Sequence, residues 1–84
     1  MTYSVLLSRR AQKQLEDTQS EDFARITEAI TALAANPRPP GCVKLTGREG
    51  WRIRVGDFRV IYEINDTQLT VSVVRIGNRR DMYR

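Results

Sequence analysis

The sequence contains no histidine, and Cys42 is its only cysteine. Without histidine, the chain lacks the side chain that most often shuttles protons and binds metals near neutral pH. A single cysteine can form neither an internal disulfide nor a zinc site built on several thiolates. We therefore expect no metal and no other cofactor, and any catalysis must rely on other side chains.

Long apolar runs are also missing. No stretch approaches the ~20 apolar residues that a membrane-spanning helix needs. The N-terminus has no basic region followed by an apolar segment, as a secretion signal would have. These patterns predict a cytoplasmic protein with no membrane partner. With 84 residues the chain can bury one core, so we expect a single domain over residues 1–84.

Lysine is scarce, whereas arginine is abundant and unevenly placed. Residues 1–42 carry five basic and five acidic side chains, and residues 43–84 carry nine basic and five acidic ones. The net charge of +4 therefore belongs to the second half, where arginine outnumbers lysine eight to one. A guanidinium is a planar, permanently charged fork that fits phosphate, so this composition favours an anion-binding surface in the second half.

The first half has the pattern of a strand and two helices. We expect a strand over residues 3–7 and a helix over residues 9–17 that follows Ser8, a good N-cap residue. A second helix should start at Glu21, because apolar residues then recur at spacings of three and four. These residues are Phe23, Ile26, Ile30 and Leu33. The proline-rich segment 36–41 ends that helix and forms a loop.

The second half has the pattern of an antiparallel meander. We expect strands over residues 51–55, 58–64 and 69–76, separated by turns at 56–57 and 65–67. Helices followed by such a meander predict an α+β fold. In this fold an N-terminal strand joins the sheet, and two helices pack on one face of a mainly antiparallel sheet.

The two-residue turn at 56–57 fixes the register of the hairpin that contains it. Counting outward from the turn, Arg54 faces Arg59 and Arg52 faces Ile61. Because side chains alternate between the faces of a sheet, the three arginines should project together, away from the helices. Like charges directly opposite each other destabilise a hairpin unless an anion lies between them. The pattern favours binding of an anion or a nucleic acid; the alternative is a basic, solvated face that keeps the protein soluble.

Further basic residues lie at the end of the last predicted strand. They are Arg75, Arg79 and Arg80. Tyr83 follows Arg79 by four residues, and the two side chains can converge on the same face.

Several residues that often carry chemistry have a structural interpretation in this sequence. Trp51 and Tyr62 fall on the apolar face of the hairpin, so we expect them in the core rather than as stacking platforms for bases. Tyr3 lies in the predicted first strand, so we expect a structural role for it as well. Cys42 has no basic partner that the sequence can fix, which argues against a reactive thiol. The acidic residues of the turns are expected to be solvated rather than to bind a metal.

Three segments resemble the RelE branch of the RelE/ParE toxin superfamily. They are residues 44–47 (KLTG), 51–62 (WRIRVGDFRVIY) and 76–83 (IGNRRDMY). Their order and spacing agree with that branch, and the resemblance extends over nearly the whole chain, including the initial strand and the two helices.

The resemblance implies a toxin of a type II toxin–antitoxin system that enters the ribosomal A site, cleaves messenger RNA without a metal and so inhibits translation. The family's catalytic cluster carries over to Arg52, Arg54, Arg59, Arg79 and Tyr83. Further RNA contacts are expected from Lys44, Arg48, Arg75 and Arg80. Some members have lysines at the positions of Arg52 and Arg54. Because a guanidinium stays protonated, the identity of the general base is open in this sequence.

The resemblance also implies partners. The toxin would be restrained by a cognate antitoxin, which we expect to be acidic because the second half of the toxin is positive. The toxin–antitoxin complex would bind its own promoter DNA. Two other functions remain open: inhibition of DNA gyrase, as in the ParE branch, and a decayed, non-toxic member that acts only in complex with its antitoxin.

Overall fold

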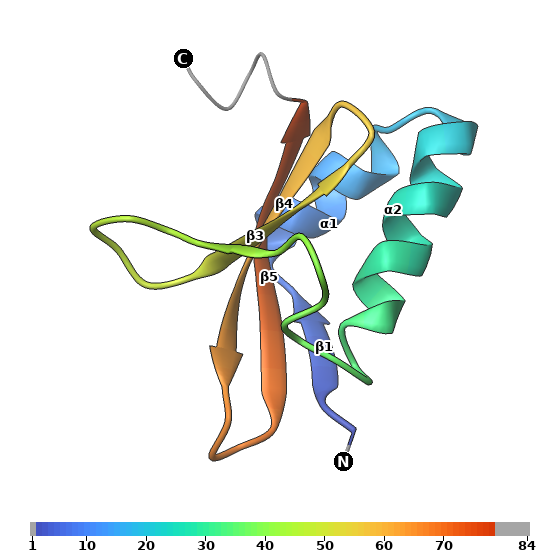
Figure 1. The fold of residues 1–84 in the computed structure, drawn as a ribbon. Helices are drawn as coiled ribbons and strands as arrows, with labels where there is room; N and C mark the ends of the chain where they lie inside the picture. Colours follow the sequence, from blue (N-terminus) through green and yellow to red (C-terminus); the bar gives the residue numbers. More distant parts are fainter. Residues whose placement is uncertain (1, 79–84) are drawn as a thin grey trace.

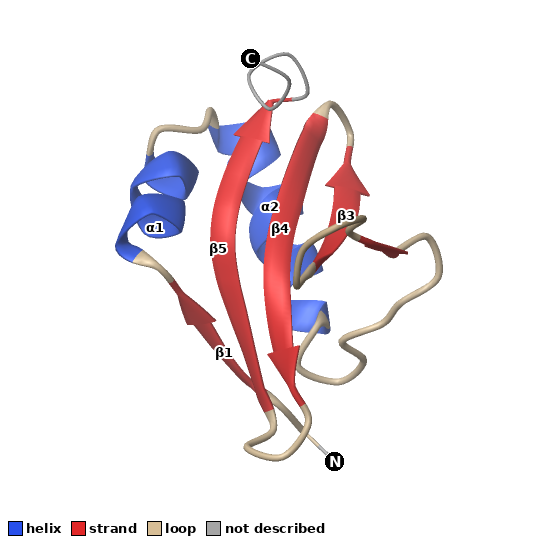
Figure 2. Ribbon diagram, turned by 90° about the vertical axis from the view of Figure 1, so that its left-hand side faces the viewer, coloured by secondary structure: helices blue, strands red, loops and turns tan. Residues whose placement is uncertain are grey.

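A computed structural model describes residues 2–78 of the chain. Its elements are β1 (Ser4–Leu7), α1 (Arg9–Glu16), α2 (Ser20–Ala32), β2 (Val43–Lys44), β3 (Trp51–Val55), β4 (Phe58–Asn65) and β5 (Thr70–Asn78). The strands form one sheet in the order β1-β5-β4-β3-β2, in which β1 is parallel to β5 and the other neighbours are antiparallel. Both helices pack on the same face of this sheet (Figure 1, Figure 2). The predicted α+β fold is therefore confirmed.

The element bounds follow the sequence pattern closely, with one addition. The short strand β2 was not predicted, because two residues cannot show an alternating pattern; it pairs antiparallel with β3. Neither helix within residues 2–78 is long and apolar enough to cross a membrane.

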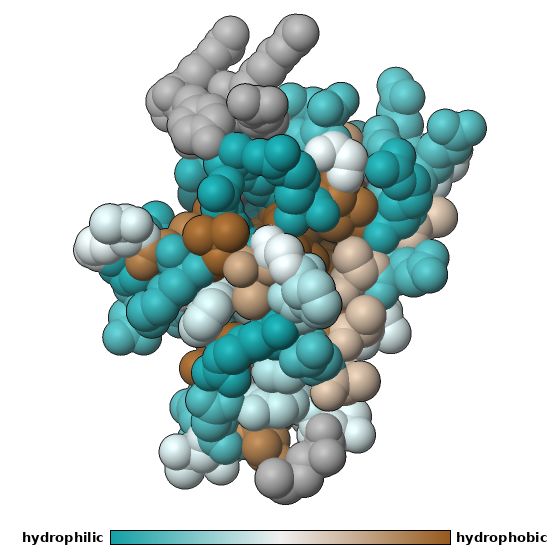
Figure 3. Space-filling view, viewed as in Figure 1, coloured by the Kyte–Doolittle hydropathy of each residue, from teal (hydrophilic) through white to brown (hydrophobic). Residues whose placement is uncertain are grey.

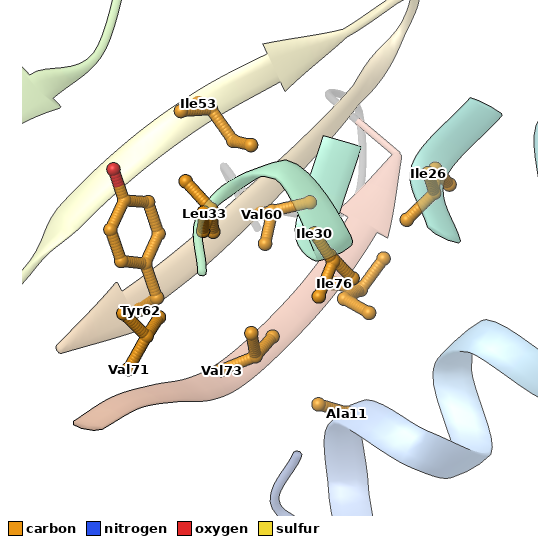
Figure 4. Packing of buried hydrophobic residues seen from close by; sticks show 10 residues of the cluster. All are labelled: Ala11, Ile26, Ile30, Leu33, Ile53, Val60, Tyr62, Val71, Val73 and Ile76. Atoms are coloured by element: carbon orange, nitrogen blue, oxygen red, sulfur yellow. The ribbon is translucent and has the colours of Figure 1, made fainter. Parts of the chain in front are cut away.

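The core lies between the helices and the sheet (Figure 4). It is built from Ala11, Ile26, Ile30, Leu33, Ile53, Val60, Tyr62, Val71, Val73 and Ile76. Tyr62 is fully buried, as its position on the apolar face predicted, and its hydroxyl donates a hydrogen bond of 2.7 Å to the carbonyl oxygen of Pro37. This bond satisfies a buried polar group and ties the proline-rich loop to β4. Phe23, in the first turn of α2, is 40% exposed, so the buried stripe of that helix begins at Ile26.

The first helix is joined to β5 by two polar side chains. The side-chain oxygen of Ser8 accepts the backbone N–H of Ala11 at 3.0 Å, which confirms Ser8 as the N-cap. The same hydroxyl donates to the carbonyl oxygen of Val74 at 3.1 Å. Further along, the backbone N–H of Ile76 donates to the side-chain oxygen of Gln14 at 2.8 Å. Helix α1 thus supplies hydrogen bonds to β5 beyond the point where β1 ends.

A β-bulge interrupts the pairing of β4 with β5. Ile61 lies opposite Arg75, whereas Tyr62 lies opposite Val73, so Val74 is an extra residue in β5. A bulge of this kind changes which side chains face each side of the sheet. Without it, position 75 would follow the buried Val73 onto the core face. With it, Arg75 projects beside Ile61 on the face away from the helices.

Candidate functional site

The hairpin of β3 and β4 has the predicted register. Arg54 lies directly opposite Arg59, and Arg52 precedes Arg54 by two residues in β3. The alternate residues Ile53 and Val60 are buried in the core. The arginines therefore project from the opposite face of the sheet, the face that is turned toward the viewer in Figure 2. Arg52, Arg54 and Arg59 are called the arginine cluster below.

The turn that sets this register depends on Gly56 and on α2. Gly56 has a φ of +60°, in the left-handed region that glycine adopts without strain. Arg25 of α2 lies across the turn, because a β-carbon at position 56 would be only 2.7 Å from the Nη2 atom of Arg25. The helix layer thus fixes the position of the hairpin tip.

The three arginines of the cluster differ in exposure. Arg59 is only 7% exposed, Arg52 is partly buried, and Arg54 is exposed. The two ion pairs found among residues 2–78 involve Arg25 and Arg38. Neither Arg52 nor Arg54 forms an ion pair within that part of the chain.

A hollow of about 230 Å³ lies at the arginine cluster. Its lining consists of Gly41, Val43, Arg52, Ile53, Arg54 and Arg59. Among residues 2–78, no carboxylate lines this first hollow, and three guanidinium groups border it. Guanidinium groups form strong, paired hydrogen bonds with phosphate oxygens, so the first hollow is suited to a phosphodiester group.

A second hollow, of about 340 Å³, adjoins the first. Its lining consists of Val43, Lys44, Leu45, Thr46, Arg48, Arg52, Arg59, Ile61 and Arg75. The two hollows therefore share Val43, Arg52 and Arg59, and carboxylates are missing from the described lining of both. The segment that joins β2 to β3 projects from the sheet on the side away from α2 (Figure 1). Hydrophilic residues dominate the surface in the same view, with hydrophobic residues in small areas between them (Figure 3).

Three of the predicted RNA-contact residues lie in the described part of the chain. Lys44, Arg48 and Arg75 line the second hollow, next to the arginine cluster. Lys44 lies opposite Trp51 in the sheet, and its ammonium is 5.4 Å from the centre of the Trp51 ring. The guanidinium of Arg38 lies 5.3 Å from the same ring centre. The Lys44 ammonium is thus engaged by an aromatic side chain, a contact that the sequence pattern did not predict.

Three predicted site residues lie outside the described residues. They are Arg79, Arg80 and Tyr83. The catalytic roles of Arg79 and Tyr83 and the RNA contact of Arg80 stay predictions.

Sequence reasoning missed a polar cluster around Asp66. This carboxylate accepts hydrogen bonds from the Arg38 guanidinium, at 2.9 and 3.3 Å, and from the Tyr3 hydroxyl, at 2.7 Å. The bonds from Arg38, and then from Tyr3, lower the pKa of Asp66, and the bond to Asp66 raises the pKa of Tyr3. The cluster joins the N-terminus, the proline-rich loop and the turn after β4. Tyr3 and Asp66 are 63 positions apart, so no local pattern could have revealed the contact.

A further hollow is less suited to an anion. It has a volume of about 560 Å³ and lies between the α1–α2 connection and the β3–β4 turn. Its lining mixes the carboxylates of Asp17, Asp22 and Asp57 with Arg25 and Arg75. Within residues 2–78, no group of three or more Cys, Asp or Glu side chains could hold a metal ion.

The described part of the chain is a small α+β protein with a cluster of arginines on the sheet face away from the helices. Residues 5–83 match the ParE toxin family of type II toxin–antitoxin systems, and the chain belongs to this family as a RelE-like member of the RelE/ParE superfamily. It is 31% identical over 88 residues to the toxin RelG of Mycobacterium tuberculosis, an alignment that spans 100% of this chain and 99% of the relative.

Solved structures agree with this assignment. A chain of the archaeal RelE–RelB complex from Pyrococcus horikoshii superposes with a TM-score of 0.83 at 28% identity, over 94% of this chain and 97% of that one. A chain of the toxin–antitoxin complex RelBE2 from M. tuberculosis has the same fold, with a TM-score of 0.82 at 24% identity, over 94% of this chain and 100% of that one. The resemblance inferred from the three sequence segments is thereby confirmed.

Proposed function

We propose that this protein is a ribosome-dependent endoribonuclease of the cytoplasm, which cleaves messenger RNA and so inhibits translation. The observation that supports the proposal is the pairing of Arg54 with Arg59 across the hairpin, with Arg52 on the same face. Together they border a hollow of about 230 Å³ that has no carboxylate in its described lining. Such a seat fits the phosphodiester group of an RNA backbone. The RelE-like sequence favours messenger RNA as the target.

Cleavage without a metal uses the ribose 2′-hydroxyl as the nucleophile. Its oxygen bonds to the adjacent phosphorus, the bond from phosphorus to the 5′ oxygen breaks, and a 2′,3′-cyclic phosphate and a 5′-hydroxyl result. The 2′-hydroxyl loses a proton to a base, and the leaving oxygen gains one from an acid. Negative charge grows meanwhile on the non-bridging phosphate oxygens. Arg54 and Arg59 stabilise this charge as preorganised cations, which is commonly the largest catalytic effect.

The arginines supply charge rather than a base, because a guanidinium has no acceptor. The resemblance adds Arg79 as a further cation, and Tyr83 as a side chain that orients the nucleotide or takes part in proton transfer. On the ribosome the message is already held in place. Positioning can therefore provide much of the rate enhancement, and weak acid–base catalysis is tolerated.

A cognate antitoxin is part of the proposal. The related chains from P. horikoshii and M. tuberculosis were solved in toxin–antitoxin complexes. The net charge of +4 and the arginine cluster favour an acidic antitoxin that covers the cluster. We further propose that the toxin–antitoxin complex binds its own promoter DNA.

The proposal is tested by the substitution Arg54→Gln. Arg54 is exposed, so its loss leaves no cavity in the core. Cleavage of a translated message is followed by primer extension, and removal of one such cation should slow it by about 10²- to 10³-fold. Arg10→Gln, an equal change of charge at an exposed position of α1, serves as the matched control and should cut as the wild type does. Undiminished cutting by Arg54→Gln contradicts the proposal.

Inhibition of DNA gyrase is the second candidate function. The observation that favours it is the match of residues 5–83 to the ParE toxin family. Expression of the toxin would then leave messages intact in the primer-extension assay, while purified toxin would block supercoiling by gyrase. The two assays together separate the two functions.

A further inference from the structure

The second hollow contains a row of side chains that, apart from Arg52, have no role in the cleavage mechanism. Strand pairing places Val43, Arg52, Ile61 and Arg75 side by side across β2, β3, β4 and β5. Cationic and apolar side chains alternate along this row. Arg54 and Arg59 form the neighbouring row, displaced along β4 by two residues, or about 6.8 Å. This displacement is comparable to the separation of consecutive phosphates along an extended single strand of RNA.

Arg75 reaches this row because of the bulge at Val74. The bulge is held by the hydrogen bond of 3.1 Å from the Ser8 hydroxyl to the carbonyl oxygen of Val74. Bulges often re-aim a side chain beside an active site. In this chain the bulge places the side chain of Arg75 on the face of the arginine cluster instead of the core face.

The guanidinium of Arg75 has no carboxylate partner among residues 2–78. Arg75 is partly buried, and its Nε atom is buried without a hydrogen-bond partner among residues 2–78. It forms no ion pair within that part of the chain. Because Arg75 lines the second hollow, a phosphate held there can pair with its guanidinium through charge-assisted hydrogen bonds. Arg48, on the other side of the hollow, adds a second cation.

The apolar members of the row fit the parts of a nucleotide that carry no charge. Val43 is 44% exposed although it is hydrophobic, and Ile61 lies between Arg52 and Arg75. Ile61 offers an apolar surface between the two guanidinium groups for a ribose or the face of a base, and Val43 offers a second one beyond Arg52. A hollow that offers cations at its rim and aliphatic side chains between them matches a nucleotide better than it matches a free anion.

We propose that the second hollow is a subsite for the nucleotide that flanks the cleaved bond. Its phosphate is bound by Arg75 and Arg48, and its ribose lies on Ile61, while the scissile phosphate lies at Arg54 and Arg59. This inference rests on the proposed function, which provides the scissile phosphate. The chain would therefore bind two consecutive phosphates of a single RNA strand rather than one.

The test compares two ligands by calorimetry: adenosine 5′-monophosphate, which carries one phosphate, and adenosine 3′,5′-bisphosphate, which carries two across a ribose. The wild type should bind the bisphosphate more tightly. Arg75→Gln should weaken binding of the bisphosphate about tenfold, the equivalent of one charge-assisted hydrogen bond, and leave the monophosphate within about twofold. Arg54→Gln should weaken both ligands. Arg10→Gln should change neither, and Arg75→Lys, which keeps the charge without the fork, should fall between Arg75→Gln and the wild type.

Two results would overturn the subsite. One is a bisphosphate affinity that Arg75→Gln leaves unchanged, and the other is an equal loss for both ligands, which would indicate a general effect of charge. Neither result changes the outcome expected for Arg54→Gln in the cleavage assay. The proposed function is therefore not contradicted if the subsite is. Conversely, undiminished cleavage by Arg54→Gln removes the function, whereas the ligand comparison still reports on the subsite.

Discussion

Replacing Ser8 by alanine should lower the free energy of unfolding by about 2 kcal/mol, because its hydroxyl serves two elements at once. As N-cap of α1 it accepts the N–H of Ala11 at 3.0 Å, and loss of such a cap costs about 1 kcal/mol. As a donor it binds the carbonyl oxygen of Val74 at 3.1 Å, and a hydrogen bond of this kind contributes about 1 kcal/mol. For a domain of this size the sum corresponds to a fall in Tm of about 8–16 °C.

Two further substitutions separate the contributions of the Ser8 hydroxyl. Ser8→Asp keeps the acceptor that caps α1 but has no donor for Val74, so it should lose about half as much, near 1 kcal/mol. Ser8→Thr keeps both groups and should remain close to the wild type. The matched control is Ser20→Ala at the start of α2, where the cap residue Gln19 makes no side-chain hydrogen bond; its effect should stay within about 0.5 kcal/mol.

The measurement is urea denaturation at pH 7, followed by circular dichroism. The reasoning is refuted if Ser8→Ala costs no more than Ser20→Ala. If Ser8→Asp is as stable as the wild type, the bond to Val74 contributes nothing, and the bulge must be held by the sheet alone.

Other predictions concern single side chains. Arg54→Gln should reduce the dependence of RNA affinity on salt, lowering the slope of log K against log salt concentration by about 0.7, as expected for one lost phosphate contact to a single strand. Asp66→Asn should make the free energy of unfolding less dependent on pH in acid. The lowered pKa of Asp66 stabilises the fold above the unfolded pKa of about 4, and this contribution is lost as the pH falls through the folded pKa. The urea midpoints of the wild type and the variant should therefore converge in acid. Tyr62→Phe should cost about 1–3 kcal/mol in urea denaturation, because the carbonyl of Pro37 loses its buried donor. Gly56→Ala should cost about 1 kcal/mol or more by the same measurement, because alanine is strained at a φ of +60°.

The register of the arginine cluster could be predicted from sequence because it depends on a local feature. A two-residue turn at 56–57 allows only one pairing of the strands around it, and alternation then assigns every side chain to a face. The N-cap at Ser8 was predictable for the same reason, since it depends on a few neighbouring residues.

The placement of Arg75 could not be predicted in this way. Residues 71–76 have the sequence Val-Ser-Val-Val-Arg-Ile. Because two valines are consecutive, the sequence does not show at which residue the alternation between the two faces of the strand is interrupted. At the bulge, the carbonyl oxygen of Val74 accepts a hydrogen bond from Ser8, which is 66 positions away. The contacts of Arg38 with Asp66 are likewise tertiary. Local patterns therefore predicted the hairpin of the site, whereas its second row depends on how α1 packs against β5.

The two faces of the hairpin have opposite effects on its stability. Like charges directly opposite each other, as at Arg54 and Arg59, oppose a hairpin. On the other face, Ile53 and Val60 are buried and each contributes about 1.5–3 kcal/mol. A slip of one residue would relieve the repulsion only by moving the arginines into the core, so burial on the helix side prevents it. The core thus holds the guanidinium groups together against their own repulsion. A bound phosphate would remove that repulsion and, at about 100 times its dissociation constant, would stabilise the fold by about 2.7 kcal/mol.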